Sequence, residues 1–321
     1  MKKTVYIILG IILIVLLIPT ALLGPYAFQV QHFTADLTNG YHADFYLYVS
    51  PKAKQLASDG KIATILVQPN NSGINSDDPK EHQRDAWVTG YERRKIADEL
   101  GVILLVPAFI RPGEDWHIYT HALDRDTLTT ERADLKRIDL QLIAMIDHAR
   151  LVLAESGINT DEHIFIQGFS ASGMFANRFT LLHPERVKAA TIGSPGGFPI
   201  LPVESYQGTS LPYPAGIADI EELTGKPFDQ ETYNRIPQLI YMGDLDDNDS
   251  LDFTDGWDEN ITSVVDALFG SDPLSRWKEA EAVYLESGAN VRFLLIEGVG
   301  HDRKALQNYS VDFFRELLEA E

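Results

Sequence analysis

Apolar and polar positions follow two different periods along this chain. Residues 28–37 and 42–49 alternate at every second position on either side of Asn39-Gly40, a dipeptide that favours a tight hairpin turn. We therefore expect two antiparallel edge strands at the start of the folded part.

From residue 62 onward, short apolar runs alternate with longer stretches of helical period. Strands are predicted at 62–68, 102–107 and 163–168, and helices at 85–100, 131–155 and 170–182. The helix at 131–155 is expected to pack one face on a sheet, because its apolar residues recur every three or four positions (Leu135, Ile138, Leu142, Met145, Ile146 and Leu153). Runs at 189–193, 239–243 and 291–297 predict three more strands, and 302–318 a last helix. This rhythm is typical of an α/β fold with a mostly parallel, twisted sheet and helices on both faces.

Residues 195–237 differ in composition from the rest. Prolines and glycines are frequent there, and aromatic residues lie between them (Phe198, Tyr206, Tyr213, Phe228 and Tyr233). Such a stretch is too aromatic for a disordered linker, and it follows the sixth predicted strand. We expect an inserted cap or lid over the strand ends.

The N-terminus predicts the compartment. Lys2 and Lys3 precede an apolar run that continues to Leu23, and residues 5–23 approach the length of about 20 residues that spans a bilayer. No position between 18 and 27 has small residues at both −3 and −1 of a cleavage site, which favours an uncleaved anchor over residues 1–27. Residues 28–321 are then an extracytoplasmic domain held at the membrane by the N-terminal segment alone; a cleaved signal peptide and secretion are the alternative.

Composition narrows the function further. The 321 residues carry a formal net charge of −20 and no cysteine. Nucleic-acid binding is excluded, because a phosphate backbone requires a basic face, and disulfides and cysteine-bound metals are excluded as well. The one basic cluster, Tyr91-Glu92-Arg93-Arg94-Lys95, is expected to lie on an exposed helix.

The strongest chemical signal is the end of the strand at 163–168. Gly168-Phe169-Ser170-Ala171-Ser172-Gly173 follows it, so small residues surround Ser170 where the chain turns into a helix. A serine at the tip of such a turn takes a strained backbone angle and projects its hydroxyl above the sheet edge. Ser172 stands where the pattern Gly-x-Ser-x-Gly has its second glycine. Ser172 fits worse as the nucleophile, and an ordinary helix N-cap is the other reading of Ser170.

A nucleophilic serine needs a base and a carboxylate that orients the base. The strand at 239–243 leads into four aspartates (Asp244, Asp246, Asp247 and Asp249), of which the turn position favours Asp246. The strand at 291–297 leads into Gly300-His301. Serine, aspartate and histidine thus follow strand ends in that order.

Ser170, the Gly-x-x-Asp turn at Gly243 to Asp246, and Gly300-His301 resemble the α/β-hydrolase superfamily over residues 28–321. The elbow sequence and the cap-like insert are most similar to secreted esterases related to polyhydroxyalkanoate depolymerases and to feruloyl or acetylxylan esterases. The resemblance implies a serine hydrolase that cleaves a small or polymeric carboxylic ester through an acyl-enzyme, without a cofactor. A peptidase or amidase with the same triad, and a surface-tethered binding protein without turnover, are the alternatives.

Two loops are expected near this site. The oxyanion donors are predicted to be the backbone amide of Ala171 and one from the loop at 69–73, where Asn70 and Asn71 lie; an Asn-rich turn without a catalytic part is the alternative. Trp116, Tyr119 and His121 are expected either to line the substrate pocket or to pack under a long loop.

The acidic run at 244–249 partly imitates a calcium loop of Asp-x-Asp-x-Asn type. It has Asp249 where that loop has glycine, and Asp255 where it has glutamate. We therefore expect a solvated acidic loop around one catalytic aspartate, and no metal.

Overall fold

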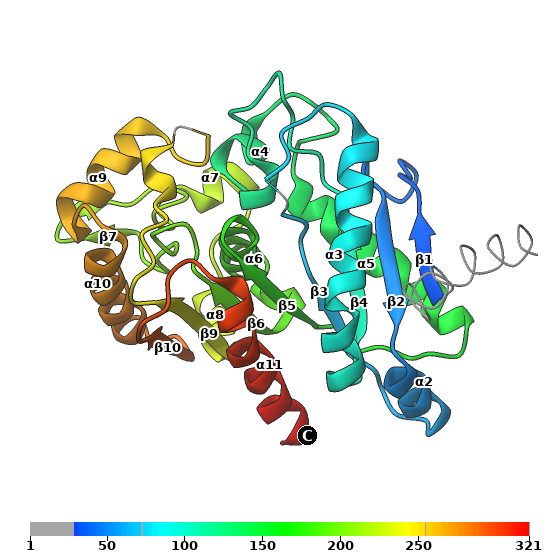
Figure 1. The fold of residues 1–321 in the computed structure, drawn as a ribbon. Helices are drawn as coiled ribbons and strands as arrows, with labels where there is room; N and C mark the ends of the chain where they lie inside the picture. Colours follow the sequence, from blue (N-terminus) through cyan, green and yellow to red (C-terminus); the bar gives the residue numbers. More distant parts are fainter. Residues whose placement is uncertain (1–28, 72, 254, 321) are drawn as a thin grey trace, which may run out of the picture.

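A computed structural model describes residues 29–71, 73–253 and 255–320. Its centre is an eight-stranded sheet in the order β1-β2-β4-β3-β5-β6-β9-β10 (Figure 1). The strands are β1 Val30–Phe33, β2 Phe45–Val49, β3 Ile65–Val67, β4 Ile103–Pro107, β5 Ile164–Phe169, β6 Val187–Gly193, β9 Gln238–Gly243 and β10 Val291–Ile296. β1 and β2 form the predicted antiparallel hairpin, β2 runs antiparallel to β4, and the pairs from β4 to β10 are parallel.

Helices cover both faces of the sheet. The longer ones are α2 Pro51–Ser58, α3 Pro79–Leu100, α5 Ile138–Glu155, α6 Ala171–Leu182, α9 Glu259–Phe269, α10 Pro273–Glu286 and α11 Arg303–Glu319. The short ones outside residues 195–237 are η1 Thr120–Ala122, α4 Arg125–Thr129, η2 Pro184–Arg186 and η3 Ser250–Asp252. α3 and α11 pack on one face, and α5, α6 and α10 on the other. Alternate strand residues enter opposite cores: Ile164 and Ile166 of β5 face the α6 side, and Phe165 faces α11.

Several predicted boundaries were wrong. α3 begins at Pro79 rather than residue 85, because Asp78 caps it by accepting from the Lys80 amide and proline suits the first helical turn. α5 begins at Ile138 rather than residue 131, after turns that end in Arg137 at a φ of 49°. α9 and α10 were not predicted.

The insert at 195–237 follows β6 and contains β7 Ser205–Tyr206, β8 Thr209–Ser210, α7 Ile220–Thr224 and α8 Gln230–Arg235. It is packed firmly on the rest of the domain. Leu211 and Tyr213 are buried in the same core as α5 and α6, and the Tyr284 hydroxyl of α10 donates to the Ile200 carbonyl at 2.7 Å. Its aromatic residues therefore extend the main core.

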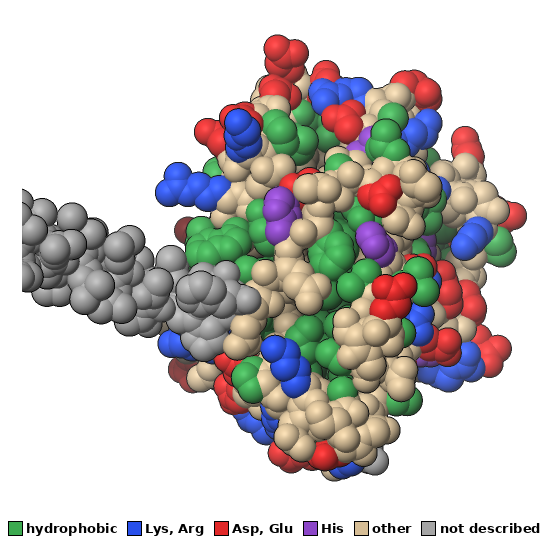
Figure 2. All heavy atoms as spheres, turned by 90° about the vertical axis from the view of Figure 1, so that its right-hand side faces the viewer, with side chains coloured by type: hydrophobic (Ala, Val, Ile, Leu, Met, Phe, Trp, Pro, Cys, Tyr) green, Lys and Arg blue, Asp and Glu red, His purple; other side chains and the backbone are tan. Residues whose placement is uncertain are grey.

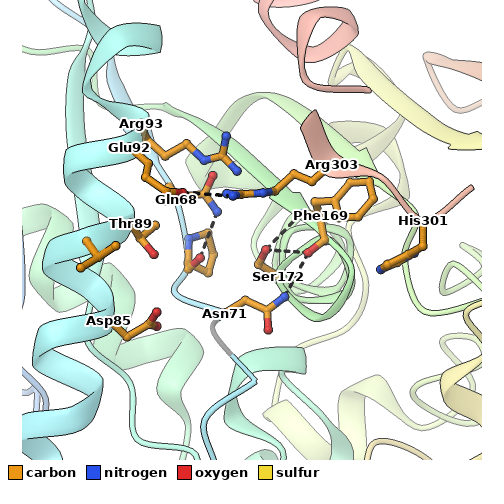
Figure 3. A pocket seen from close by; sticks show the side chains of 12 residues that line it. Gln68, Asn71, Asp85, Thr89, Glu92, Arg93, Phe169, Ser172, His301 and Arg303 are labelled. Atoms are coloured by element: carbon orange, nitrogen blue, oxygen red, sulfur yellow. Dashed lines mark hydrogen bonds and ion pairs between the residues drawn. The ribbon is translucent and has the colours of Figure 1, made fainter. Parts of the chain in front are cut away.

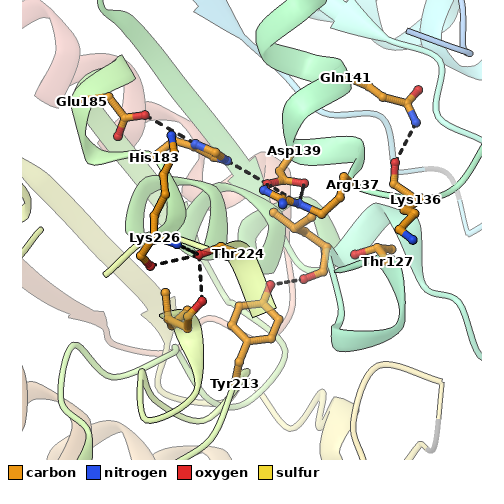
Figure 4. A network of polar contacts seen from close by, with 12 residues as sticks. Thr127, Lys136, Arg137, Asp139, Gln141, His183, Glu185, Tyr213, Thr224 and Lys226 are labelled. Carbon is orange, nitrogen blue, oxygen red and sulfur yellow. Dashed lines mark hydrogen bonds and ion pairs between the residues drawn. The ribbon is translucent and has the colours of Figure 1, made fainter. Parts of the chain in front are cut away.

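A buried ionic network joins α5 to the end of α6 (Figure 4). Asp139, in the first turn of α5, lies 2.8 Å from His183 Nε2 and 2.7 Å from Arg137 Nη2. Burial raises the pKa of Asp139, but hydrogen bonds from His183 and Arg137 outweigh it and lower the pKa to about 2. Burial lowers the pKa of His183, but its bonds to Asp139 and Glu185 outweigh it and raise the pKa above its ordinary value.

The face of the molecule on the β1 side carries charges of both signs, mostly around its rim (Figure 2). Acidic and basic side chains are interspersed there with apolar ones (Figure 2), the mixture of an ordinary solvated surface. The predicted anchor at 1–27 lies outside the described residues, and among the residues that are described no helix has the length and apolar character needed to cross a membrane.

Candidate active site

Ser170 occupies a strained turn between β5 and α6. Its φ of 60° and ψ of −129° lie outside the regions that side-chain-bearing residues favour. Two glycines are sterically required around it. A Cβ at Gly168 would lie 1.8 Å from the Ser172 carbonyl oxygen, and one at Gly173 would lie 2.4 Å from the Gly193 carbonyl oxygen. The small residues of the sequence thus permit the tight elbow at Ser170.

Ser172 closes the elbow. Its hydroxyl donates to the Phe169 carbonyl at 2.9 Å and accepts from the Phe169 amide at 3.0 Å, and the residue is 3% exposed. Ser170 is half-buried, and its side chain does not cap α6. Of the two serines, Ser170 is therefore the one whose hydroxyl is left for chemistry.

His301 and Asp246 come together at the ends of neighbouring parallel strands. His301 Nδ1 lies 3.0 Å from Asp246 Oδ1 and 2.9 Å from Oδ2. A proton on Nδ1 leaves Nε2 free to accept another. Gly243 permits the approach of the two loops, because a Cβ there would lie 1.9 Å from the Val299 carbonyl oxygen. The ring of His301 also lies 4.8 Å from that of Phe169, next to Ser170.

The Asp246 carboxylate stays ionised beside His301. Burial raises its pKa, but hydrogen bonds from His301 and from the Asn248 amide outweigh the burial and hold the pKa below its ordinary value. An ionised carboxylate keeps the imidazole in one orientation and stabilises its protonated form.

The other three aspartates of the run lie elsewhere. Asp244 accepts from the Gly298 amide at 2.7 Å, Asp249 pairs with Arg276 at 2.5 Å, and Asp247 is exposed. Among the described residues, no group of three or more His, Asp or Glu is placed to hold a metal ion.

The predicted oxyanion loops lie against the elbow. Ala171 is the first residue of α6, where a backbone N–H has no partner within the helix. The Asn71 side chain donates to the Phe169 carbonyl at 3.2 Å, which holds Asn71 beside the elbow. Asn70 is buried, with its amide group bonded to both backbone groups of Phe109 at 3.0 and 3.1 Å. Both side chains are thus engaged in positioning the loop.

Residues of the loop at 111–121 have different surroundings. Trp116 is 47% exposed, and Tyr119 is half-buried under the Arg111 guanidinium, 3.9 Å from its ring centroid. His121 is buried, with Nε2 2.9 Å from the Phe109 carbonyl and 3.0 Å from Asn70 Nδ2. Burial lowers the pKa of His121 to about 3, so the ring is neutral. His121 packs under the loop, as the alternative reading held, and supports Asn70.

A cleft of about 370 Å³ adjoins His301 (Figure 3). Its walls are the elbow, the loop after β3, and the residues of α3 and α11 that face each other, among them Thr89, Arg93 and Arg303. The expectation that the basic cluster at 91–95 lies on an exposed helix is wrong for Arg93, which is 6% exposed. Asp85, Thr89 and Glu92 follow one another at four- and three-residue spacing, a polar stripe on one face of α3 that was a readable sign of this wall.

No family model and no curated relative matches the sequence. Solved structures do match. A poly(aspartic acid) hydrolase from Sphingomonas sp. KT-1 has a TM-score of 0.55 at 18% identity, covering 88% of this chain and 97% of that one. A poly(3-hydroxybutyrate) depolymerase from Bordetella parapertussis has a TM-score of 0.53 at 17% identity, covering 90% and 89%.

An S-formylglutathione hydrolase from Agrobacterium tumefaciens has a TM-score of 0.50 at 17% identity, covering 90% of this chain and 94% of that one. Structural similarity at this sequence identity is evidence for the fold. It agrees with the strand order and with the elbow at Ser170. The chain has the α/β-hydrolase fold, as the resemblance implied.

Proposed function

We propose that this protein is a serine hydrolase that cleaves carboxylic esters through an acyl-enzyme. The observation that carries the proposal is the strained Ser170 elbow together with the Asp246–His301 pair at the ends of β9 and β10. A serine in this conformation and an oriented histidine are the two groups that acyl transfer requires.

In the proposed mechanism, Ser170 Oγ attacks the ester carbonyl while His301 Nε2 takes its proton. The resulting oxyanion accepts hydrogen bonds from the Ala171 amide and from an amide of the loop at 69–73. His301 then gives the proton to the leaving alkoxide as the carbonyl carbon–oxygen bond breaks. Water, activated by His301, hydrolyses the acyl-serine and restores the hydroxyl.

The start of the insert at 195–237 supports a role in shaping the substrate site. A Cβ at Gly196 would lie 2.4 Å from Met174 Sδ, one turn into the helix that begins after Ser170. The Gly196 carbonyl also accepts from the Ser250 hydroxyl at 2.6 Å, on the segment that follows Asp246. We propose that the insert acts as the cap that forms one wall of the acyl pocket.

Steady-state hydrolysis of p-nitrophenyl esters and p-nitroanilides tests the proposal. Wild type should cleave the esters, and Ser170→Ala and His301→Ala should each lower kcat by roughly 10³ or more, because triad members act as a unit. Ser58→Ala, at an exposed serine of α2, is the matched control and should behave as wild type. Wild-type activity in Ser170→Ala would refute the mechanism, and a preference for the anilides would identify an amidase.

We also propose that residues 1–27 anchor the domain at the outer side of the membrane. The two lysines before the apolar run at 5–23 support this orientation. Mass spectrometry of the native N-terminus separates an anchor from a cleaved signal peptide.

A further inference from the structure

The cleft beside His301 contains a buried cation that forms no ion pair of its own among the described residues. Arg93 of α3 is 6% exposed and lines the cleft. Among the described residues, the acceptor for its guanidinium is the Gln307 side chain of α11, and its Nε has no partner. A guanidinium carries five N–H donors, so most of them remain available.

Arg276 is a second buried arginine, and it does have acidic partners. Its side chain is 1% exposed and pairs with Asp249 at 2.5 Å and Asp266 at 2.6 Å. Arg178 is 2% exposed and has no ion pair among the described residues, but its guanidinium lies 5.1 Å from the Trp257 ring centroid and donates to the Ala122 carbonyl at 2.9 Å. Burial of a charge costs free energy, and in both arginines carboxylates or an aromatic ring of this chain offset part of that cost. Among the described residues, Arg93 has neither a paired carboxylate nor an aromatic ring beside its guanidinium, and unlike Arg178 it lines a cleft, where a ligand can supply the counterion.

A second arginine lies at the same end of the cleft. Arg303, at the start of α11, extends towards Arg93, as Figure 3 shows, and donates to Glu92 at 3.0 Å. Burial and the charge of Arg303 lower the pKa of Arg93 to about 10, which leaves Arg93 protonated at neutral pH. Glu92 balances one of the two positive charges, and Asp85 lines the opposite end of the cleft, nearer Asn71.

We propose that Arg93 and Arg303 form a carboxylate-binding subsite, and that the natural substrate is an ester whose alcohol part carries a carboxylate. Arginine donors match a carboxylate, with two parallel hydrogen bonds from one fork. The placement on the alcohol part rests on the proposed function: His301 lines the same cleft and must deliver its proton to the leaving alkoxide, so the alcohol part lies on this side of Ser170.

Matched substrates test the subsite. 4-Acetoxybenzoate and its methyl ester have the same scissile acetyl ester, and only the first has a free carboxylate. Wild type should prefer the carboxylate in kcat/KM by about tenfold or more.

Arg93→Gln and Arg303→Gln should each remove most of that preference. Arg303 is partly exposed, so its variant should fold normally. Arg315→Gln is the control, because Arg315 lies on the same helix and pairs with Asp312 and Glu99.

Binding separates this proposal from the hydrolase proposal. Calorimetric titration of 4-hydroxybenzoate into Ser170→Ala should show binding that Arg93→Gln in the same background weakens by about tenfold. If wild type hydrolyses neither ester but this arginine-dependent binding is present, the hydrolase proposal fails and the subsite stands. If both esters are hydrolysed with equal kcat/KM, or the preference persists in both arginine variants, the subsite is refuted and the hydrolase stands.

Discussion

Gly168 sets the geometry of the candidate nucleophile, and its substitution is a direct test of the elbow. An alanine Cβ would lie 1.8 Å from the Ser172 carbonyl oxygen, so the turn must open in Gly168→Ala. Because a displacement of about 1 Å at a reacting group costs about 100-fold in rate, kcat/KM for p-nitrophenyl acetate should fall at least that far.

Gly157→Ala is the control for backbone strain. Its φ is +78°, and a Cβ there meets no atom within 4 Å. The variant should lose about 1 kcal/mol of stability and keep its activity. Equal activity of Gly168→Ala and wild type would contradict the assignment of this turn as a nucleophile elbow.

Ser172 gives a second prediction at the residue scale. Ser172→Ala removes the two hydrogen bonds with Phe169, so the free energy of unfolding should fall by about 1–2 kcal/mol in urea titrations. Activity should fall by less than about tenfold, far less than in Ser170→Ala. A loss of activity as large as that of Ser170→Ala would contradict the assignment of Ser170, rather than Ser172, as the nucleophile.

The residues that follow strand ends were readable from the sequence because each depends on a local strand–turn pattern. This pattern predicts Ser170 and His301, and it favours Asp246 among four aspartates that the sequence alone leaves open. The sequence does not identify Arg93 as a site residue, because its burial depends on contact with α11. That helix lies more than 200 residues further along the chain. For His121, the sequence does not distinguish a side chain that lines the substrate pocket from one that packs beneath the loop.

At the scale of elements, the link between α5 and α6 predicts a pH-dependent stability. The pKa of His183 is raised in the fold, so the protonated ring contributes stability that is fully present below about pH 6.5 and lost as the pH rises through the raised pKa. The pKa of Asp139 is lowered to about 2, so its contribution is present above about pH 4 and lost as the pH falls towards 2.

His183→Gln tests this link, because glutamine keeps a donor for Asp139 without the charge. Urea unfolding should show a larger destabilisation at pH 5.5 than at pH 8.5. The same loss at both values would show that the charge of His183 does not contribute.

The sequence predicts helices and strands correctly where a local signal marks them. It fails where tertiary packing determines whether a segment is a helix. β5, β6 and β9 were found from short apolar runs alone. α10 was missed although it buries Trp277, Val283 and Tyr284, because its mean composition is polar and its apolar face is completed by Phe293 of β10. The turns before α5 were predicted as helix, since Leu135 fits the helical period by chance.

At the scale of the whole molecule, residues 29–320 carry the sheet, both cores and the candidate site. A chain that begins at residue 29 should therefore fold on its own and keep kcat/KM within about twofold of the full chain. Under the anchor hypothesis, the full chain should sediment with membranes and the shortened one should remain in the supernatant. Loss of folding in the shortened chain, or equal sedimentation of both, would contradict this division.

The central claim is that Ser170 is an activated nucleophile, and covalent labelling tests it most directly. Intact-mass spectrometry after treatment with a fluorophosphonate should show one adduct on the wild-type protein, mapped to the peptide that contains Ser170, and none on Ser170→Ala. An unlabelled wild type, or equal labelling of the two proteins, would contradict the account.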